Sequence, residues 1–137
     1  MKKITEYLEI KNLISPFPGL DGLPRLEELY ISHNGITVIE GLEKNTKITT
    51  LDLGSNMITT IENIGHLSEL EEFWFNDNKC DSWKDVEVLN TFEKLETVYM
   101  ERNPLHTNDM TAYRRKMMLA VPKLKQLDAT MTASGGF

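Results

Sequence analysis

The chain has 137 residues and carries a formal net charge of −6 at pH 7. This acidic balance disfavours a nucleic acid or an anionic membrane surface as the main partner. The length suits a single domain, and every apolar run is shorter than the roughly 18 residues of a membrane-spanning helix. With one cysteine and no glycosylation sequon, we expect an intracellular, reducing compartment, in the nucleus and cytoplasm.

One apolar pattern organises the rest of the chain. The segment Leu26–Lys47 follows the spacing L-x-x-L-x-L-x-x-N-x-I-x-x-I-x-x-L, which recurs after 22 residues, after 22 more and finally after 25. A fixed period of this length is typical of leucine-rich repeats. Each copy carries an asparagine where the chain is expected to leave a strand: Asn34, Asn56, Asn78 and Asn103.

The residue types in each copy predict its local structure. The x-x-L-x-L segment is a short strand, and neighbouring copies pair in parallel at about 4.7–4.9 Å. Alternation across the strand turns these pairs inward: Leu29 and Ile31, Leu51 and Leu53, Phe73 and Phe75, Val98 and Met100. We therefore predict an α/β leucine-rich-repeat solenoid with a parallel β-sheet on its concave face. Short 3₁₀ or helical returns lie on its convex face, and a helix caps its C-terminal end.

Residues 1–25 are predicted to form a degenerate first repeat. Because Glu9 stands where a core residue is expected, the strand is placed near Leu8–Ile10. The segment Ser15–Gly19 contains two prolines, which exclude a helix and predict an irregular return loop. This end of the array is poorly capped, so we expect its exposed edge to allow self-association.

Regular repeats are predicted over residues 26–103, and the third is longer than the others. Its Trp83–Phe92 segment is expected to form an α-helix capped by Asp81 or Ser82. Residues 104–130 then form the C-terminal cap, and we expect residues 131–137, which are small and glycine-rich, to be a mobile tail.

Within the cap, the sequence predicts one helix followed by one strand. Asn108 or Asp109 begins the helix and Pro122 ends it. Its apolar stripe consists of Tyr113, Met117, Ala120 and Val121. A last short strand is expected within Leu124–Ala129.

Catalytic chemistry is not indicated. The three histidines, His33, His66 and His106, are scattered, with no nucleophile or carboxylate at triad-like spacing. Cys80 occupies the core column of Ile36 and Ile58 and is expected to be a buried thiol. No Cys/His cluster has zinc spacing and no glycine-rich loop follows a strand. We therefore expect a non-enzyme with no cofactor and no metal.

The informative residues are those that project from the strands onto the concave surface. The column between the inward positions reads Tyr30, Asp52, Trp74, Tyr99 and Asp128; the column before it reads Glu28, Thr50, Glu72, Thr97 and Gln126; the column after it reads Ser32, Gly54, Asn76 and Glu101. Aromatic residues ringed by polar groups are typical of interface hot spots. The alternative is that the aromatics only pad one another. Because Asp52 separates Tyr30 from Trp74, we expect no continuous aromatic row, which favours binding.

Several strings resemble one family closely. LEELYISHNGITVIEGLE, LDLGSNMITTIENIGHLSELEEFWFNDN, LETVYMERNPL and YRRKMMLAVPKLKQLDAT are similar to the C-terminal part of the leucine-rich-repeat regulatory subunit of type 1 protein phosphatase. The resemblance covers about Leu20 to Thr130, whereas the sequence before Leu26 matches poorly. It implies that the concave face docks the phosphatase catalytic subunit. The implied binding residues are Asp52, Glu72, Trp74 and Tyr99, and Glu28 and Tyr30 extend this set.

Two other functions remain open at this stage. A similar capping segment closes a leucine-rich spliceosomal protein, which suggests a ribonucleoprotein-associated module. Its RNA would require basic surface, and the one basic cluster is Arg114-Arg115-Lys116 on the cap helix. A cytoskeletal or axonemal adaptor of the same repeat class is the other alternative. The acidic concave columns favour a partner that presents lysines or arginines.

Overall fold

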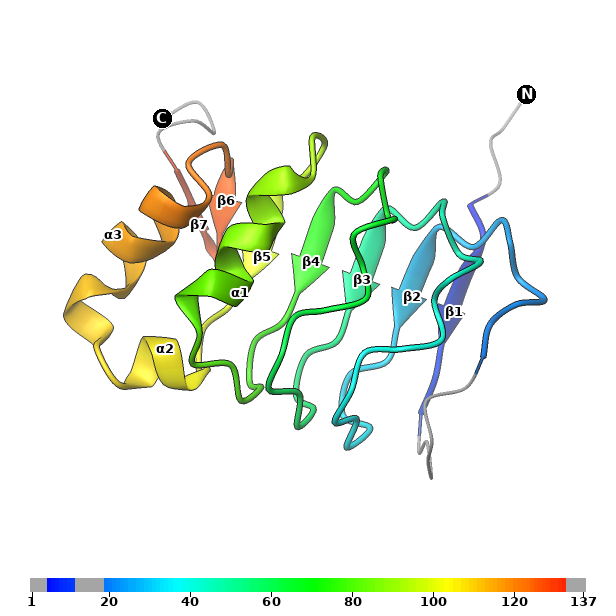
Figure 1. Ribbon diagram of the computed structural model, residues 1–137, viewed down its shortest axis with the longest axis horizontal. Coiled ribbons are helices and arrows are strands. Elements are labelled where there is room, and N and C mark those ends of the chain that lie inside the picture. Colours follow the sequence, from blue (N-terminus) through cyan, green and yellow to red (C-terminus); the bar gives the residue numbers. More distant parts are fainter. Residues whose placement is uncertain (1–4, 12–18, 133–137) are drawn as a thin grey trace.

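The structure, a computed structural model, describes residues 5–11 and 19–132 of the chain (Figure 1). A seven-stranded sheet contains its strands in sequence order. The strands are β1 (Tyr7–Glu9), β2 (Glu28–Tyr30), β3 (Thr50–Asp52), β4 (Glu72–Trp74), β5 (Thr97–Tyr99), β6 (Gln126–Leu127) and β7 (Thr130–Met131). Figure 1 shows them side by side in one layer, with the return segments in front.

The strand register confirms the predicted parallel solenoid. Strands β1 to β6 pair in parallel, and Leu8, Leu29, Leu51, Phe73, Val98 and Leu127 face one another across successive strands. Every predicted inward residue from β2 to β5 is fully buried. The first strand lies one residue earlier than expected, but Leu8 and Ile10 do pack against the core.

The asparagine column joins each repeat to its neighbours. The Asn56 Oδ1 atom accepts hydrogen bonds from the Asn34 and Ile36 backbone N–H groups, each at 3.0 Å. Its Nδ2 atom donates to the carbonyl oxygens of Ile31 at 3.0 Å and Leu53 at 2.8 Å. Because an amide both donates and accepts, one side chain pairs backbone groups of two turns.

The residue before each of these asparagines adopts a left-handed backbone conformation. His33, Ser55, Asp77 and Arg102 have φ between 53° and 60°. Such values are uncommon outside glycine, so the same turn geometry recurs in every repeat although the residue type changes. The sequence carries no common residue that marks this position.

The return segments differ in part from the prediction. Between β2 and β4, where every residue is described, they are built from isolated turns and contain no 3₁₀ helix; one such turn is the Asn45 N–H bond to the Leu42 carbonyl at 3.1 Å. The next return is helical, but only its first part is α-helix: α1 spans Trp83–Glu87 and the 3₁₀ helix η1 spans Val88–Thr91. Ser82 is the N-cap, and its hydroxyl accepts from the Asp85 N–H at 3.4 Å.

The C-terminal cap contains α2 (Pro104–Thr107) and α3 (Met110–Ala120). Asp109 caps α3 by accepting from the Ala112 N–H at 3.4 Å, as predicted. Tyr113 and Met117 point into the core, and Val121, just after the helix, is also buried. The antiparallel partner of β6, strand β7, was not expected. Because β7 reaches residue 131 and Thr132 is buried, these two residues belong to the cap and not to the predicted tail.

Parts of two predictions fall outside the described residues. The return loop Ser15–Gly19 does so except for Gly19, and the proposed tail does so after Thr132. Among the helices that the structure does describe, none is long and apolar enough to cross a membrane.

Candidate functional site

The concave face of the sheet carries two rows of outward side chains, as the sequence columns predict. Strand register places Glu28 beside Thr50, Thr50 beside Glu72 and Glu72 beside Thr97. The second row runs Tyr30, Asp52, Trp74, Tyr99. We call these two rows the concave site. Except for the buried Thr50, their members are half-buried, so each keeps a solvent-facing part.

The aromatic residues of the concave site form a continuous row. The ring centroids of Tyr30 and Trp74 lie 6.1 Å apart, and those of Trp74 and Tyr99 lie 5.6 Å apart, both in edge-to-face geometry. The expectation that Asp52 would interrupt the row is wrong, because the long rings of Tyr30 and Trp74 reach each other past the short aspartate. Aromatic rings in edge-to-face contact stabilise one another, so packing against each other is part of the role of these three residues.

The polar ends of two of these rings are held by glutamates in the neighbouring row. The Tyr30 hydroxyl donates to Glu28 Oε1 at 2.7 Å, and the Trp74 Nε1–H donates to Glu72 Oε1 at 3.3 Å. Burial is the main reason that the pKa of Tyr30 is raised to about 12, and the hydrogen bond to Glu28 is the second. Each glutamate retains its second carboxylate oxygen as an acceptor. The concave site is therefore an aromatic surface edged by pre-positioned anions.

Asp52 lies in the middle of this surface, and the interactions that stabilise its negative charge do not fully offset the cost of its burial. Burial raises the pKa of its carboxyl group, and a hydrogen bond from the Gly54 N–H at 2.9 Å opposes the shift only in part. His33 also opposes it electrostatically. A desolvated carboxylate gains from a cation brought close to it. This position is therefore suited to a lysine or arginine from outside the chain.

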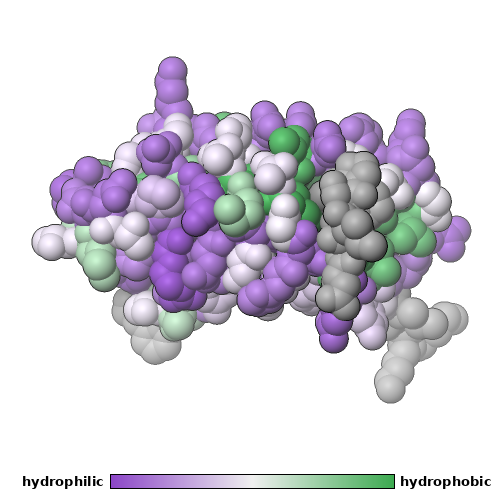
Figure 2. Space-filling model, turned by 90° about the horizontal axis from the view of Figure 1, so that it is seen from below, coloured by the Kyte–Doolittle hydropathy of each residue, from purple (hydrophilic) through white to green (hydrophobic). Residues whose placement is uncertain are grey.

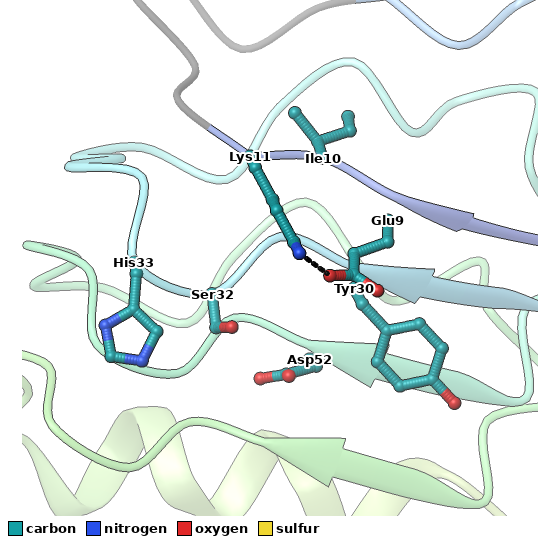
Figure 3. A pocket seen from close by; sticks show the side chains of 7 residues that line it. All are labelled: Glu9, Ile10, Lys11, Tyr30, Ser32, His33 and Asp52. Carbon is teal, nitrogen blue, oxygen red and sulfur yellow. Dashed lines mark ion pairs between the residues drawn. The ribbon is translucent and has the colours of Figure 1, made fainter.

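A pocket of about 480 Å³ opens beside Asp52 at the N-terminal end of the site (Figure 3). It is lined by Glu9, Ile10, Lys11, Tyr30, Ser32, His33 and Asp52. Figure 3 shows Asp52 and Ser32 between His33 and Tyr30, while Lys11 pairs with Glu9 at 3.2 Å. Glu9, Lys11 and His33 were not predicted to belong to the site. The irregular first repeat hides the alignment of the first two, although Glu9 pairs in register with Tyr30.

Asp128, expected in the outward column, is turned away from the concave site. Its Oδ1 atom accepts from the backbone N–H groups of Met100 at 2.8 Å and Glu101 at 3.0 Å. Its Oδ2 atom accepts from the Tyr113 hydroxyl at 2.7 Å. Like the asparagine Oδ1 atoms, this carboxylate accepts from backbone N–H groups of the preceding repeat, but it makes no donor bonds to carbonyls. Desolvation and the nearby Asp128 charge raise the pKa of Tyr113.

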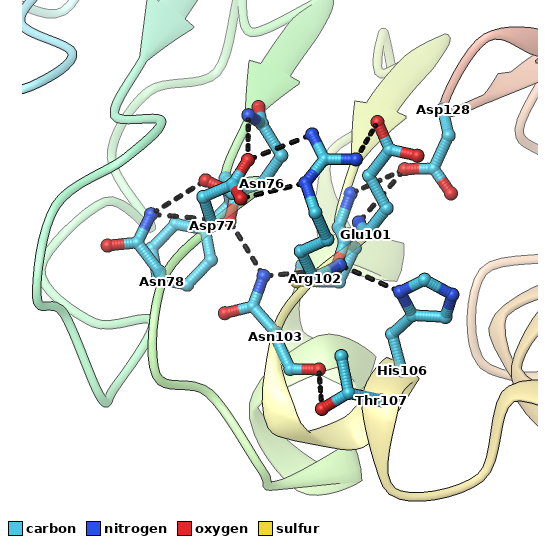
Figure 4. A network of polar contacts seen from close by, with 11 residues as sticks. Asn76, Asp77, Asn78, Glu101, Arg102, Asn103, His106, Thr107 and Asp128 are labelled. Carbon is cyan, nitrogen blue, oxygen red and sulfur yellow. Dashed lines mark hydrogen bonds and ion pairs between the residues drawn. The ribbon is translucent and has the colours of Figure 1, made fainter.

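A polar network lies at the edge where the strands end (Figure 4). Arg102 contacts Asp77 at 2.7 Å through Nε and Glu101 at 3.3 Å through Nη1. The hydrogen bond from Arg102 holds the pKa of Asp77 below its ordinary value. His106 Nδ1 accepts from the Arg102 backbone N–H at 2.7 Å. Figure 2, which looks at this edge, shows mainly hydrophilic side chains, so the edge rims the site with solvated charge.

The remaining candidate sites are Cys80, a metal site and a second hollow. Cys80 is fully buried, as predicted, and burial raises the pKa of its thiol to about 11, so a nucleophilic thiolate is disfavoured. Among the described residues, no group of three or more His, Cys, Asp or Glu side chains is placed to hold a metal ion. A larger hollow of about 710 Å³ at the opposite edge of the strands is lined by side chains of both charges, including Arg25, Glu27 and Lys47.

The parallel strands and the asparagine column that links them define a leucine-rich-repeat solenoid fold. A family model described as leucine-rich repeats in two copies matches residues 24–66. Among solved structures, a chain of the Drosophila melanogaster SNF/U2A′ complex has a TM-score of 0.77 and 26% identity, covering 91% of this chain and 72% of that one. An internalin, InlF from Listeria monocytogenes, has a TM-score of 0.62 and 26% identity, covering 82% of this chain and 32% of that one.

Curated relatives narrow the resemblance to regulatory subunits of protein phosphatase 1. The chain is 42% identical to the subunit SDS22 of Schizosaccharomyces pombe over 47% of its own length and 20% of that protein. It is 47% identical to pprA of Dictyostelium discoideum (54% and 21% covered) and 56% identical to human regulatory subunit 7 (36% and 13% covered). The resemblance seen in the sequence is thereby confirmed. The matches span only about a fifth or less of each relative.

Proposed function

We propose that the chain is a non-catalytic binding module whose concave site docks the catalytic subunit of type 1 protein phosphatase. The observation that carries this proposal is the aromatic row Tyr30–Trp74–Tyr99, edged by Glu28 and Glu72 and containing the half-buried Asp52. The names of the curated relatives supply the partner. Within the docking surface, Trp74 is the central anchor because it contacts both other rings.

The proposed mechanism combines apolar contact with charge pairing. The exposed parts of the three rings bury apolar surface against the partner, which gives a favourable term of roughly 25 cal/mol per Å² removed from water. Basic side chains of the phosphatase meet the free carboxylate oxygens of Glu28 and Glu72 and the carboxylate of Asp52. For Asp52, such a cation also compensates the desolvation that the free protein already bears. The chain regulates or holds the enzyme by occupying its surface and performs no chemistry itself.

The row from Tyr30 to Tyr99 crosses three strand spacings, or about 14 Å. A standard interface takes about 800 Å² from each partner, so contacts must extend beyond the row. The pocket lined by Glu9, Lys11 and His33 continues the surface toward the N-terminal end. We therefore include these residues at the margin of the docking surface.

A titration of purified chain with the phosphatase catalytic subunit tests the proposal. Replacing a central tryptophan anchor by alanine costs about 2 kcal/mol or more, so Trp74→Ala should weaken binding at least about 30-fold. Leu119→Ala is the matched control, since Leu119 is 71% exposed on α3 and lies outside the concave site. Binding should also weaken as salt rises. Absence of binding by the wild-type chain, or equal losses in the two variants, would refute the proposal.

The similarity to a chain of the SNF/U2A′ complex supports a second candidate, a ribonucleoprotein-associated module. Two members of the basic cluster on α3 already bind groups within the chain, which argues against direct RNA contact there. The Arg114 guanidinium donates to the Met131 carbonyl at 3.1 Å, and Lys116 pairs with Asp109 at 3.4 Å. Adding RNA in place of the phosphatase to the same titration separates the candidates. We expect no RNA binding at physiological salt.

A further inference from the structure

Tyr99, the last ring of the concave site, has a hydrogen-bond environment unlike the other two. The side-chain amide of Gln126, on β6, places its Nε2 atom 3.1 Å from the Tyr99 hydroxyl oxygen and 2.8 Å from the Asp128 carbonyl oxygen. A backbone carbonyl oxygen can only accept a hydrogen bond. The Gln126 atom that faces Asp128 must therefore be the nitrogen, which has two hydrogens to give.

This geometry determines the direction of the hydrogen bond to Tyr99. One Nε2 hydrogen goes to the Asp128 carbonyl and the other to the Tyr99 oxygen, so the tyrosine accepts from Gln126. A phenolic hydroxyl both accepts and donates, so the hydrogen of Tyr99 points to a different acceptor. By contrast, the hydrogens of the Tyr30 hydroxyl and the Trp74 Nε1 atom are already given to Glu28 and Glu72.

We propose that Gln126 is a positioning residue that keeps the Tyr99 hydroxyl available as a hydrogen-bond donor to an acceptor on the docked phosphatase. This inference rests on the docking function proposed above and extends it. Glu28, Asp52 and Glu72, on β2 to β4, are suited to cations, whereas the Tyr99 hydroxyl, on β5, is suited to a carbonyl or carboxylate oxygen. The partner surface is thus polarised along the sheet, and this polarity sets the orientation in which it docks.

A purely structural role for Gln126 is the competing explanation. Its bond to the Asp128 carbonyl helps to close the turn between β6 and β7. Losing that bond would lower stability and weaken binding whether or not Tyr99 has a hydroxyl group. A double-mutant cycle distinguishes the two roles, because only a positioning role makes the effect of Gln126 depend on the Tyr99 hydroxyl.

The experiment is a titration of the phosphatase catalytic subunit with Tyr99→Phe, Gln126→Met and the double variant, with thermal unfolding of each. A neutral hydrogen bond contributes about 1 kcal/mol, so Tyr99→Phe should weaken binding about fivefold. Gln126→Met should weaken phosphatase binding several-fold when Tyr99 is present and should have no effect on binding in the Tyr99→Phe background. Leu119→Ala, on α3 and outside the concave site, is the control, and its binding should stay within about twofold of wild type.

The outcomes separate this inference from the docking function. If the wild type binds and Trp74→Ala does not, but Tyr99→Phe binds like the wild type, the donor role is refuted and docking stands. An equal loss from Gln126→Met in both backgrounds refutes the positioning role as well. If the wild-type chain does not bind, both proposals fail together. Gln126→Glu gives a further check, since its carboxylate would accept the Tyr99 hydrogen and should weaken binding despite its similar size.

Discussion

Asn78→Ala should destabilise the repeat array strongly. The Asn78 side chain is 2% exposed. Its Oδ1 atom accepts from the Ile58 N–H at 3.0 Å, and its Nδ2 atom donates to the carbonyls of Leu53 at 2.9 Å and Phe75 at 3.3 Å. The substitution removes these three bonds and a longer one from Nδ2 to the Asn76 carbonyl at 3.4 Å, and it adds no new partner.

The size of the effect depends on which groups lose every partner. The Leu53 carbonyl still accepts from Asn56 at 2.8 Å, and the Phe75 carbonyl still accepts from Asn103 at 2.8 Å. The Ile58 N–H loses the bond to Asn78, and an unsatisfied buried donor costs about 1–3 kcal/mol. The two weakened carbonyls add about 0.5–1.5 kcal/mol each. We therefore expect a loss of about 2–6 kcal/mol, a large part of the roughly 5–15 kcal/mol that is typical of a domain.

Urea unfolding followed by circular dichroism measures this loss. The matched control is Asn76→Ala, because Asn76 is half-buried and its Nδ2 atom donates to the neighbouring Asp77 carboxylate at 2.8 Å. A surface change of this kind should cost less than about 1 kcal/mol. If Asn78→Ala costs no more than Asn76→Ala, the asparagine column does not hold the turns together as described.

Three further predictions concern other parts of the chain. Asp52→Asn should raise the urea midpoint at neutral pH, because burial raises the pKa of Asp52 and its charged form therefore lowers the free energy of unfolding. The gain should disappear below the ordinary pKa of 3.8, where Asp52 is protonated in both states. A gain that persists at that pH would contradict this explanation. Tyr113→Phe should cost about 1.5–3 kcal/mol in the same assay through loss of the bond to Asp128, and a neutral result would show that this bond does not close the cap. We also expect self-association through the edge strand β1, so the mass measured by sedimentation should rise with protein concentration. Tyr7→Pro should suppress this rise, because proline removes a strand N–H.

The core and the strand order could be predicted from the sequence because both follow from a simple period. Leu29, Leu51 and Phe73 recur at a fixed spacing, and only one register buries all of them. The same register assigns Asp52 and Trp74 to the outward rows. The columns of the concave site were therefore predictable residue by residue, and Leu8 still pairs with Leu29 although Glu9 breaks the 22-residue period in the first repeat.

The contacts within the site could not be predicted, because they depend on side-chain reach. The spacing of Tyr30 and Trp74 suggests two separate rings, but their lengths let them meet past Asp52. Asp128 matches the outward column by counting, yet a left-handed backbone, with φ 53°, turns its carboxylate toward Met100 and Glu101. A residue count carries no information on either effect.

The two tryptophans offer the most direct test of concave docking. Trp74 lies in the concave site, whereas Trp83 lies on α1, in the return segment of the same repeat. In protein labelled with 5-fluorotryptophan, the two ¹⁹F signals can be followed while the phosphatase catalytic subunit is added. Docking on the concave site predicts that the Trp74 signal shifts and the Trp83 signal keeps its position. A shift of Trp83 with Trp74 unchanged would contradict the account.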